Sequence, residues 1–574
     1  MDKKEIAKVF EEIALLLELE AENPFRVRAY RNAAIALLNL DEDLQKIVKE
    51  ERLTELPGIG DDLAEKITTL VKTGRLPFYE KLKKAAPPGV SELMQIQGLG
   101  PKKIMVLYKK LKIHSIKALK EACLKDKVAK LSGFGKKTQE NILNAITHRE
   151  VYSQRHLWWD AMAIATPLLE GLRKLKEVKK VEIAGSLRRK LETIGDLDIL
   201  VASSKPKPIM NWFISHPLVA SVLTKGEAKS SVRLKKGIQV DLLIVPEEQF
   251  GSALCYLTGS KEHSIRIRQR ALKKGWTLNE WGLTTKKKTI QHMETENALY
   301  KALGLSYIPP ELREDRGEIE AAEKGKLPKL VEEEDIRGTF HNHTSASDGK
   351  NTLQEMVSAA QKLGWEYIGI SDHSKSSFQA NGMDEKRLHK QEEQIRELNG
   401  SKKFRPYVFA GVECDILPNG TLDFSNEVLK KLDYVIVSVH SVFNQDEKTM
   451  TKRLIRAIEH PYSTMVGHVT GRILLKREGY RVNLPKVIDA CIANGKIMEL
   501  NASPMRLDMD WRLWHSASEK GLLCAINTDA HSVDHLEFFR AGVNAARKGW
   551  LEKKHIINTL SLKEMRKLLK KFRG

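Results

Sequence analysis

The sequence predicts a multidomain protein with a helical N-terminal region, a central α+β region and a C-terminal α/β region. The chain has 574 residues, and one domain rarely exceeds about 250 residues. Residues 1–150 consist of short helical stretches with similar glycine turns between them, and strand-like runs begin near Trp158. From residue 336 onward apolar strand-like runs alternate with helical stretches, which is typical of parallel βα units.

The composition favours a polyanionic partner. The formal net charge is +21, and nucleic acid is the usual partner of so basic a chain. No stretch approaches the ~20 apolar residues of a membrane span, and the first 20 residues lack the cleavage pattern of a signal peptide. The five scattered cysteines form no CxxC pair, which favours a reducing compartment. We therefore expect a cytoplasmic protein without a membrane partner.

Three similar turns interrupt the helices of the N-terminal region: LPGIG at 56–60, IQGLG at 96–100 and LSGFG at 131–135. Turns repeated every ~35–40 residues indicate helical units, expected here at 1–85 and 86–150. Paired glycines let the backbone approach a phosphate, and the next helix presents free N–H groups to it. The turns resemble helix-hairpin-helix motifs, which bind the DNA backbone without reading sequence. The residues expected at DNA are Gly58, Gly60, Gly98, Gly100, Lys102, Lys103, Gly133 and Gly135, with Lys136 and Lys137 after the third turn.

Three aspartates form the candidate centre of the middle region. In GDLDIL, Asp196 and Asp198 share one face of a strand, because residues i and i+2 of a strand point the same way. Asp241 lies in the apolar run QVDLLIV, where an acid is otherwise costly. Two or three such carboxylates can hold the two divalent ions that phosphoryl transfer uses. The backbone N–H groups of Gly185 and Ser186, with the Arg189 guanidinium, can hold a triphosphate.

These segments resemble the family X DNA polymerases. The palm of that family is matched by GSLRR, GDLDIL and VDLLIV. Its thumb is similar to the segment YLTGSKEHSIRIRQRALKKGWTLNEWGL. The resemblance implies a nucleotidyltransferase palm at 151–245, a thumb at 246–315, and Mg²⁺ or Mn²⁺ in the site. The sequence departs from vertebrate members at Lys261 and Ser264. The implied nucleotide-binding residues are Gly185, Ser186, Arg189, Gly195, Tyr256, Gly259, Lys261, Ser264 and Arg268.

The first glycine turn also resembles the small 5′-phosphate-binding domain of the family. Lys66 occupies the place of a lysine that can form a Schiff base with an abasic sugar, so it is a candidate lyase residue. A lysine nucleophile needs a depressed pKa. Asp62 replaces a basic neighbour of lyase-competent members, which opposes that depression. An ordinary solvated helix lysine is the alternative.

Metal-ligand residue types cluster in the C-terminal region. Each follows an apolar strand-like run, and the carboxyl ends of parallel strands converge on one face. Mixed imidazole and carboxylate ligands suit Zn²⁺, Mn²⁺ or Fe²⁺. Nine candidates are too many for one ion, so we expect two or three. The nine are His341, His343, Asp348, His373, Glu413, His440, His468, Asp529 and His531.

This cluster resembles the PHP (polymerase and histidinol phosphatase) domain, which implies a distorted seven-stranded (βα) barrel at 336–574. All nine ligands of that family have counterparts here, which implies an active phosphoesterase. Arg472, in GHVTGR, is a candidate phosphate clamp. The charged segment 316–335 is poor in aromatic residues and is expected to be a linker.

The combined resemblance implies a bacterial gap-filling DNA polymerase that also carries a 3′–5′ exonuclease, with a role in base-excision or end-joining repair. Abasic-site incision is associated with some members. Expected partners are gapped or primer-template DNA and deoxynucleoside triphosphates, and the protein is expected to be a nucleoid-associated monomer. One alternative is a repair nuclease with a vestigial transferase half. A second alternative is a DNA-bridging scaffold.

Overall fold

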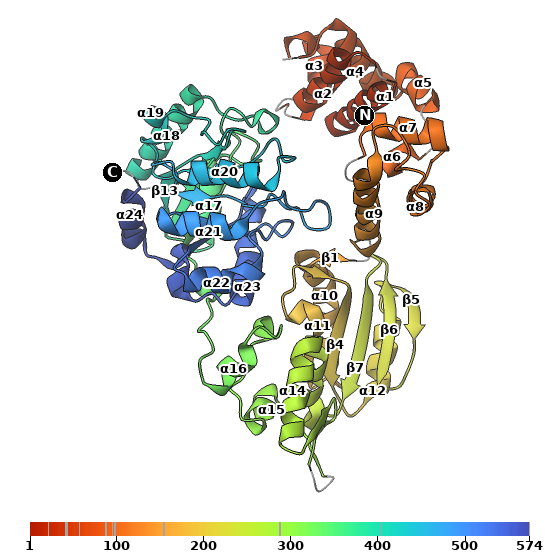
Figure 1. Ribbon diagram of the computed structural model, residues 1–574, viewed down its shortest axis with the longest axis vertical. Helices are drawn as coiled ribbons and strands as arrows, with labels where there is room; N and C mark the ends of the chain where they lie inside the picture. Colours follow the sequence, from red (N-terminus) through yellow and green to blue (C-terminus); the bar gives the residue numbers. More distant parts are fainter. Residues whose placement is uncertain are drawn as a thin grey trace. The chain divides into compact units, whose positions relative to one another are not determined.

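The computed structural model describes residues 1–20, 22–38, 40, 44–56, 58–85, 89–94, 96, 99–152, 155–285, 289–401 and 403–572 (Figure 1). The chain forms two compact units, Met1–Ser153 and Gln154–Gly574. Among the described residues, no helix is both long and apolar enough to cross a bilayer.

The first unit is entirely helical over its described residues. It has two hydrophobic clusters, one under the first five helices and one under the last four. Its helices are α1 (Lys3–Leu19), α2 (Pro24–Leu38), α3 (Leu44–Lys49), α4 (Asp61–Thr73), α5 (Pro77–Ala85), α6 (Val90–Leu93), α7 (Pro101–Leu111), α8 (Ile116–Leu124) and α9 (Gly135–Tyr152).

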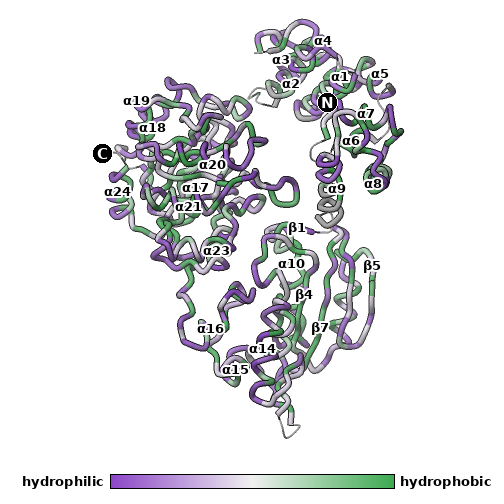
Figure 2. Tube along the Cα trace, in the orientation of Figure 1, coloured by the Kyte–Doolittle hydropathy of each residue, from purple (hydrophilic) through white to green (hydrophobic). Residues whose placement is uncertain are grey.

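The second unit begins with a mixed five-stranded sheet in the order β2-β4-β7-β6-β5. The central strands β4 and β7 are parallel, and their apolar residues are visible as green runs in Figure 2. Helices α10 (Trp158–Arg173) and α12 (Pro206–Ile214) share the main hydrophobic cluster of this sheet. The strands are β2 (Lys180–Ile183), β4 (Asp196–Ala202), β5 (Val219–Thr224), β6 (Lys229–Leu234) and β7 (Gln239–Val245). A two-stranded sheet pairs β1 (His156–Leu157) with β3 (Thr193–Ile194).

A small α+β part follows the five-stranded sheet. It contains α13 (Phe250–Thr258), α14 (Lys261–Lys273), α15 (Glu296–Ala302) and an antiparallel sheet of β8 (Thr277–Asn279), β9 (Gly282–Thr284) and β10 (Ile290–Gln291). Apolar residues of α14, β9 and α15 form its own hydrophobic cluster.

The segment 316–335 is not an extended linker. It contains helix α16 (Glu318–Glu323), whose Ile319 and Ala322 pack into the cluster of the preceding part. The carboxylate of Glu318 is fully buried and lies 2.7 Å from Nδ1 of His263. The charged composition of 316–335 predicted a linker. Glu318 is instead hydrogen-bonded to His263, which lies 55 residues earlier in the sequence.

The C-terminal region consists of parallel strands covered by helices. One sheet has the order β11-β12-β13 and the other β14-β15-β16-β17-β18. Parallel bridges join His373 to Glu413 between the two sheets, and Asn342 to Ala530 beside the first and last strands. The strands are β11 (Gly338–Thr339), β12 (Tyr367–Ile370), β13 (Tyr407–Ala410), β14 (Glu413–Asp415), β15 (Ile436–Ser438), β16 (Met465–Val466), β17 (Ile497–Asn501) and β18 (Leu523–Asn527).

Helices cover these strands and close one end. A large hydrophobic cluster joins the strands to the surrounding helices, and a second contains aromatic residues such as Tyr367 and Phe409 together with Met565 and Leu569 of α24. Tyr367 begins β12, so α24 covers the amino ends of the strands. The helices are α17 (Leu353–Lys362), α18 (Glu385–Ser401), α19 (Asn426–Leu429), α20 (Glu447–Ile458), α21 (Leu484–Ala493), α22 (Trp511–Glu519), α23 (Phe539–Lys548) and α24 (Leu562–Lys570).

Candidate active sites

The three aspartates predicted from the sequence lie together on the two central strands of the five-stranded sheet. Asp196 and Asp198 lie on β4, and Asp198 is paired directly with Asp241 of β7 in the parallel register. Burial and the neighbouring carboxylates of Asp196 and Asp241 raise the pKa of Asp198 to about 7. Three mutually repelling carboxylate groups fit hard divalent cations such as Mg²⁺ or Mn²⁺, which relieve the repulsion.

The glycine-serine turn lies directly beside this carboxylate cluster. Gly185 begins the short helix α11 (Gly185–Arg188) with φ of +61°. A Cβ atom at Gly185 would lie only 2.1 Å from Oδ2 of Asp198. The N–H of Ala184 donates to the backbone oxygen of Asp198 at 2.8 Å. The turn that was expected to hold a triphosphate, with Ser186 on α11, is therefore fixed against a carboxylate expected to bind metal.

Both arginines of this turn are paired with glutamates. The Arg188 guanidinium donates to both carboxylate oxygens of Glu296, at 2.9 and 2.7 Å. Arg189 donates through Nε to Oε1 of Glu314 at 3.0 Å and through Nη1 to the backbone oxygen of Thr258 at 2.5 Å. Arg189 was predicted from the sequence, but its acidic partner lies 125 residues later and leaves no local signal.

The candidate nucleotide-binding residues of the thumb lie around the turn between α13 and α14. Arg268 stacks over the ring of Tyr256, at 5.1 Å from its centroid, and both line a small pocket with Ser264. Gly259 directly follows α13, and Lys261 is exposed at the first position of α14. Gly195 lies directly before β4, one residue before Asp196.

The glycine turns of the first unit precede helices as expected. Gly60 and Gly100 are the N-cap residues of α4 and α7. Gly133 and Gly135 have φ of +84° and +64°, and Gly135 begins α9. A Cβ atom at any of these four glycines would meet no heavy atom of the described chain within 4 Å. Gly58 also has positive φ, with Asn32 as its neighbour. Gly98 lies outside the described residues, and Lys102 and Lys103 lie in the first turn of α7.

Lys66 is not a free amine in this structure. It forms an ion pair with Asp62, one helical turn earlier on α4, and its side chain is 14% exposed. Its Nζ also lies 5.6 Å from the centroid of the Phe78 ring. The aspartate that the sequence identified as unfavourable for a lyase therefore contacts the amine directly.

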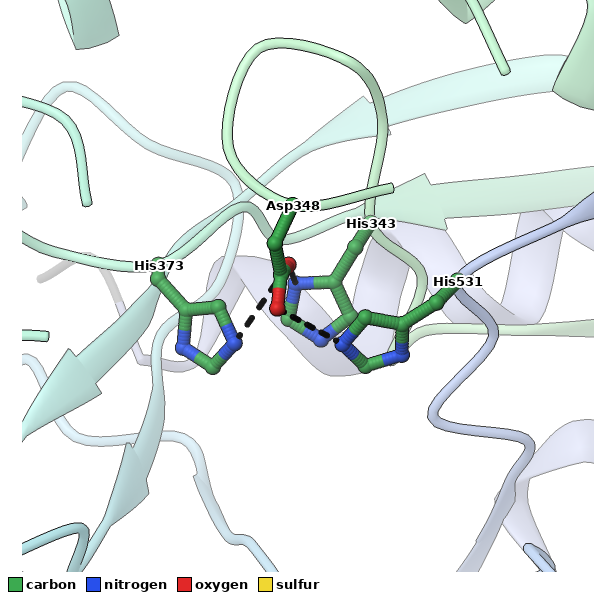
Figure 3. Close-up of side chains that lie close together, drawn as sticks. All are labelled: His343, Asp348, His373 and His531. Carbon is green, nitrogen blue, oxygen red and sulfur yellow. Dashed lines mark ion pairs between the residues drawn. The ribbon is translucent and has the colours of Figure 1, made fainter. Parts of the chain in front are cut away.

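The nine candidate metal ligands of the C-terminal region converge at the carboxyl ends of its strands. Figure 3 shows four of them, with Asp348 between three imidazole rings. Four groups have ligand atoms within 4.8 Å of one another: His343, Asp348, His373 and His531; His341, His343 and Asp529; His341, Glu413 and His468; and His373, Glu413 and His440. Shared members join the four groups into one cluster.

Glu413 lies at the centre of this cluster. Its Oε2 lies 3.2 Å from Nε2 of His341 and 2.9 Å from Nδ1 of His373. Its Oε1 lies 2.9 Å from Nε2 of His468 and 3.2 Å from Nε2 of His440. A carboxylate surrounded by four imidazoles can bridge neighbouring cations.

Two further carboxylates, Asp529 and Asp348, lie between imidazoles of the cluster. Oδ1 of Asp529 lies 3.4 Å from Nε2 of His343 and 3.7 Å from Nε2 of His341. Asp348 lies 3.2 Å from Nε2 of His531 and 3.7 Å from Nε2 of His373. Acids and imidazoles therefore alternate through the whole cluster.

Buried ligand atoms in the cluster lack ordinary hydrogen bonds. Among the described residues, these atoms include Nε2 of His341, Nε2 of His343, Nδ1 of His373 and Oε2 of Glu413. Buried polar atoms are nearly always satisfied, so unsatisfied atoms that point toward one another indicate a missing partner. Divalent metal ions with mixed nitrogen and oxygen coordination fit this donor set.

The charges of the cluster shift the pKa values of its members strongly. Burial, together with the neighbouring His531 and His373, lowers the pKa of His343 to about 4. Burial would also lower the pKa of His440, but Glu413 and Asp415 raise it to about 10. The imidazoles of one cluster therefore lie in very different electrostatic surroundings.

Two acids that the sequence argument missed orient the ligands. Glu499 is fully buried on β17, and its Oε2 lies 2.7 Å from Nδ1 of His341. Asp415 lies 3.1 Å from Nδ1 of His440. Carboxylates at the second nitrogen of a ligating imidazole fix its tautomer and direction. The sequence could have indicated these acids only by their positions in strands. Asp415 comes two residues after Glu413, and Glu499 lies in the apolar run IMELN.

The Arg472 guanidinium is paired within the protein. It donates through Nη1 to Asp510 at 2.7 Å, through Nε to the backbone oxygen of Arg506 at 2.9 Å, and through Nη2 to that of Leu507. These bonds hold the loop after β17, and the role of Arg472 as a phosphate clamp stays a prediction from the sequence. The arginine that contacts a candidate ligand is Arg506, whose Nε lies 3.3 Å from Oδ2 of Asp529.

Four known families match parts of the chain. Residues 1–76 match a helix-hairpin-helix domain, and residues 90–147 match a SAM-like helix-hairpin-helix tandem. Residues 253–314 match the DNA polymerase beta thumb, and residues 339–503 match the PHP domain. These matches confirm the predicted class of helical, thumb and PHP regions.

Relatives match the full chain or its C-terminal region. The DNA polymerase/3′-5′ exonuclease PolX of Bacillus subtilis (strain 168) is 38% identical over 575 residues, covering 100% of both chains. A protein named probable phosphatase from Thermoanaerobacter sp. (strain X514) is 28% identical over 231 residues, 38% of this chain and 89% of that protein. Another protein of that name, from Caldicellulosiruptor bescii, is 29% identical over 200 residues, 33% of this chain and 78% of that protein.

Proposed function

The chain belongs to the family X DNA polymerases that carry a C-terminal PHP domain, and from this we propose that it is a DNA polymerase with an associated 3′–5′ exonuclease. One observation carries the proposal: a single chain contains both a palm with three adjoining aspartates and a cluster of nine metal-ligand residues. The three aspartates suit nucleotidyl transfer, and the cluster of nine ligands suits phosphodiester hydrolysis.

The palm residues have separate tasks in the transfer reaction. Asp196, Asp198 and Asp241 would hold Mg²⁺ or Mn²⁺, which neutralises the charge that develops on the reacting oxygens. The backbone of the Gly185-Ser186 turn and the Arg189 guanidinium would bind the triphosphate. Because the turn touches Asp198, the bound triphosphate would be fixed close to the three carboxylates.

Five residues of the thumb would contact the incoming nucleotide and the primer-template: Tyr256, Gly259, Lys261, Ser264 and Arg268. Tyr256 and Arg268 are already stacked on one another beside Ser264. Lys261 is exposed at the start of α14, where its ammonium group can reach an anionic nucleotide. Of these residues, Gly259 lies next to the Arg189 guanidinium. Gly195, directly before β4, would complete the nucleotide-binding set.

The PHP domain would remove nucleotides from 3′ ends. Its nine ligands would hold two or three Mn²⁺, Zn²⁺ or Fe²⁺ ions, which polarise a phosphodiester and lower the pKa of a water molecule. Glu499 and Asp415 orient His341 and His440 for that task. Incision at abasic sites is a further activity that this hydrolytic centre would support.

The helix-hairpin-helix units would bind the DNA backbone at a short gap during repair. Four glycines of the turns have no described heavy atom within 4 Å of the position of a Cβ atom: Gly60, Gly100, Gly133 and Gly135. A phosphate could therefore approach the backbone there, near the start of the following helix. We propose gapped DNA as substrate, deoxynucleoside triphosphates as co-substrates and a monomer at the bacterial nucleoid. Lys66 would act as a lyase nucleophile only after its ion pair with Asp62 opens.

Substitution of one ligand in each centre tests the two functions separately. Asp196→Ala and His341→Ala variants of the full chain are compared on one gapped, labelled substrate with Mg²⁺ or Mn²⁺, and both primer extension and primer degradation are measured. We expect the first variant to lose only synthesis and the second to lose only degradation.

Two other results would replace this proposal. Degradation without any synthesis by the unsubstituted protein would identify a repair nuclease with a vestigial transferase half. DNA bridging that persists in the double variant, with neither activity in the unsubstituted protein, would identify a scaffold.

A further inference from the structure

The last residue of helix α23 in the PHP domain reaches the arginine turn of the palm. Lys548 is almost fully buried, with 1% of its surface exposed. Its Nζ donates to the backbone oxygen of Arg189 at 3.0 Å and to that of Glu311 at 3.3 Å, and it lies 2.5 Å from Oε1 of Glu314. A lysine of the nuclease domain is therefore bonded directly to the turn that is proposed to bind the triphosphate.

One carboxylate oxygen joins this lysine to the arginine of the turn. Oε1 of Glu314 accepts hydrogen bonds from both Lys548 and Nε of Arg189. Nη1 of Arg189 donates to the backbone oxygen of Thr258, next to the turn between α13 and α14. No described residue takes a hydrogen bond from Nη2 of Arg189, so this side of the guanidinium remains for a phosphate.

The surroundings of Lys548 act on its charge in opposite directions. The Trp511 ring lies beneath the ammonium group, with its centroid 4.5 Å from Nζ, and Glu192 adds a second acidic neighbour. Burial lowers the pKa of Lys548 to about 8, although Glu314 opposes this shift. The ammonium form therefore still predominates at pH 7. Two cations, Lys548 and Arg189, then share the carboxylate of Glu314, so Glu314 does not neutralise Arg189 alone.

We propose that Lys548 is a positioning residue of the polymerase: it neutralises Glu314 so that Arg189 keeps its direction and its net attraction for the triphosphate of the incoming nucleotide. Without Lys548, Glu314 would cancel the charge of Arg189 and repel the triphosphate. The nuclease domain would thus complete the nucleotide site of the polymerase. This inference rests on the proposed polymerase function.

The test uses the full-length chain and four variants: Lys548→Met, Glu314→Gln, the double variant, and Lys553→Met as the matched control. Lys553 is an exposed lysine of the same domain that pairs with Asp335 at 3.1 Å, away from the turn. Insertion of one nucleotide into gapped DNA gives kcat and the KM for the nucleotide. Mn²⁺-dependent digestion of single-stranded DNA by the same preparations checks that the PHP domain is folded.

We expect Lys548→Met to raise the KM for the nucleotide about tenfold, which corresponds to about 1.4 kcal/mol, because the negative charge of Glu314 would then be balanced by Arg189 alone. The kcat, the digestion rate and the Lys553→Met control should stay close to the wild-type values. Glu314→Gln keeps the acceptor oxygen and removes the charge, so its KM should not rise. The double variant should have the same KM as Glu314→Gln. If Lys548 only stabilised the fold, removing the charge of Glu314 would not restore the KM in this way.

An unchanged KM in Lys548→Met overturns the proposal, and so does a double variant as poor as Lys548→Met. If Lys548→Met does not fold, Glu314→Gln alone decides, since a higher KM in that variant contradicts the charge argument. Failure of the proposed polymerase function is recognised separately, because the unsubstituted chain would then insert no nucleotide at all.

Discussion

At the scale of single residues, the second unit depends on charges that are buried only because they are paired. Glu296, Arg313 and Glu318 are all at least 95% buried, and each has an oppositely charged or hydrogen-bonding partner from a distant segment. Removing one member of such a pair leaves an uncompensated charge, which costs more than the pair contributes. The palm and thumb are joined through these groups, since Glu296 contacts Arg188 of the arginine turn.

Glu296 predicts a specific dependence of stability on acid. Burial would raise its pKa, but Arg313 and Arg188 lower it to about 2 from an ordinary 4.5. A carboxyl whose folded pKa is depressed stabilises the fold above pH 4.5 and loses this contribution as the pH falls toward 2. The shift corresponds to about 3 kcal/mol. We expect Glu296→Gln to lower the urea midpoint at pH 7 and to approach the wild-type midpoint near pH 2.

The exposed Glu247 is the control for this titration. It pairs with Lys180 at 3.0 Å with a side chain that is 48% exposed, so Glu247→Gln should change the midpoint little at any pH. A constant difference between wild type and Glu296→Gln from pH 7 to pH 2 would contradict the assignment.

At the scale of elements, the turn between β2 and β4 depends on one glycine. Gly185→Ala would place a Cβ atom 2.1 Å from Oδ2 of Asp198 and would force a left-handed φ on alanine. The carboxylate must move, so we expect gap filling to fall by at least about a hundredfold, since a displacement of about 1 Å in an active site costs that much. Digestion of single-stranded DNA by the PHP domain should be retained.

Gly237→Ala separates backbone strain from the clash. Gly237 lies between β6 and β7 of the same sheet and has φ of +88°, but its Cβ atom would meet no described heavy atom within 4 Å. This variant should lose some stability and keep polymerase activity. Equal loss of synthesis in both glycine variants would show that strain, and not displacement of Asp198, is responsible.

The sequence predicted those parts of the sites that follow from local periodicity. Asp196 and Asp198 share a strand face, and the PHP ligands follow apolar strand runs, so short-range patterns were enough to find them. The ion pair of Arg472 was not predicted, because its partner Asp510 comes from a loop 38 residues later. Helix α16 was missed because the burial of Glu318 depends on His263, and such pairing across the chain leaves no periodic signal.

At the scale of the whole molecule, the surplus of positive charge should appear as a strong salt dependence of DNA binding. Each phosphate contact that releases counterions on duplex DNA changes the slope of log Kd against log salt by about 0.9. Lys136 and Lys137 follow the third glycine turn and lie at the start of α9. If both contact phosphates, replacing them by methionine should reduce the slope by about 1.8, with weaker binding at low salt.

The exposed pair Lys553 and Lys554 provides the matched control, because it has the same charge and lies in the PHP domain near Asp335 and Glu552. Binding of gapped DNA is measured by fluorescence anisotropy between about 50 and 200 mM salt, where such slopes are large. Replacing the control pair should leave the slope unchanged if the helix-hairpin-helix units bind the gap. Equal slopes for the two double variants would show instead that DNA is attracted by net charge alone, without a role for the glycine turns.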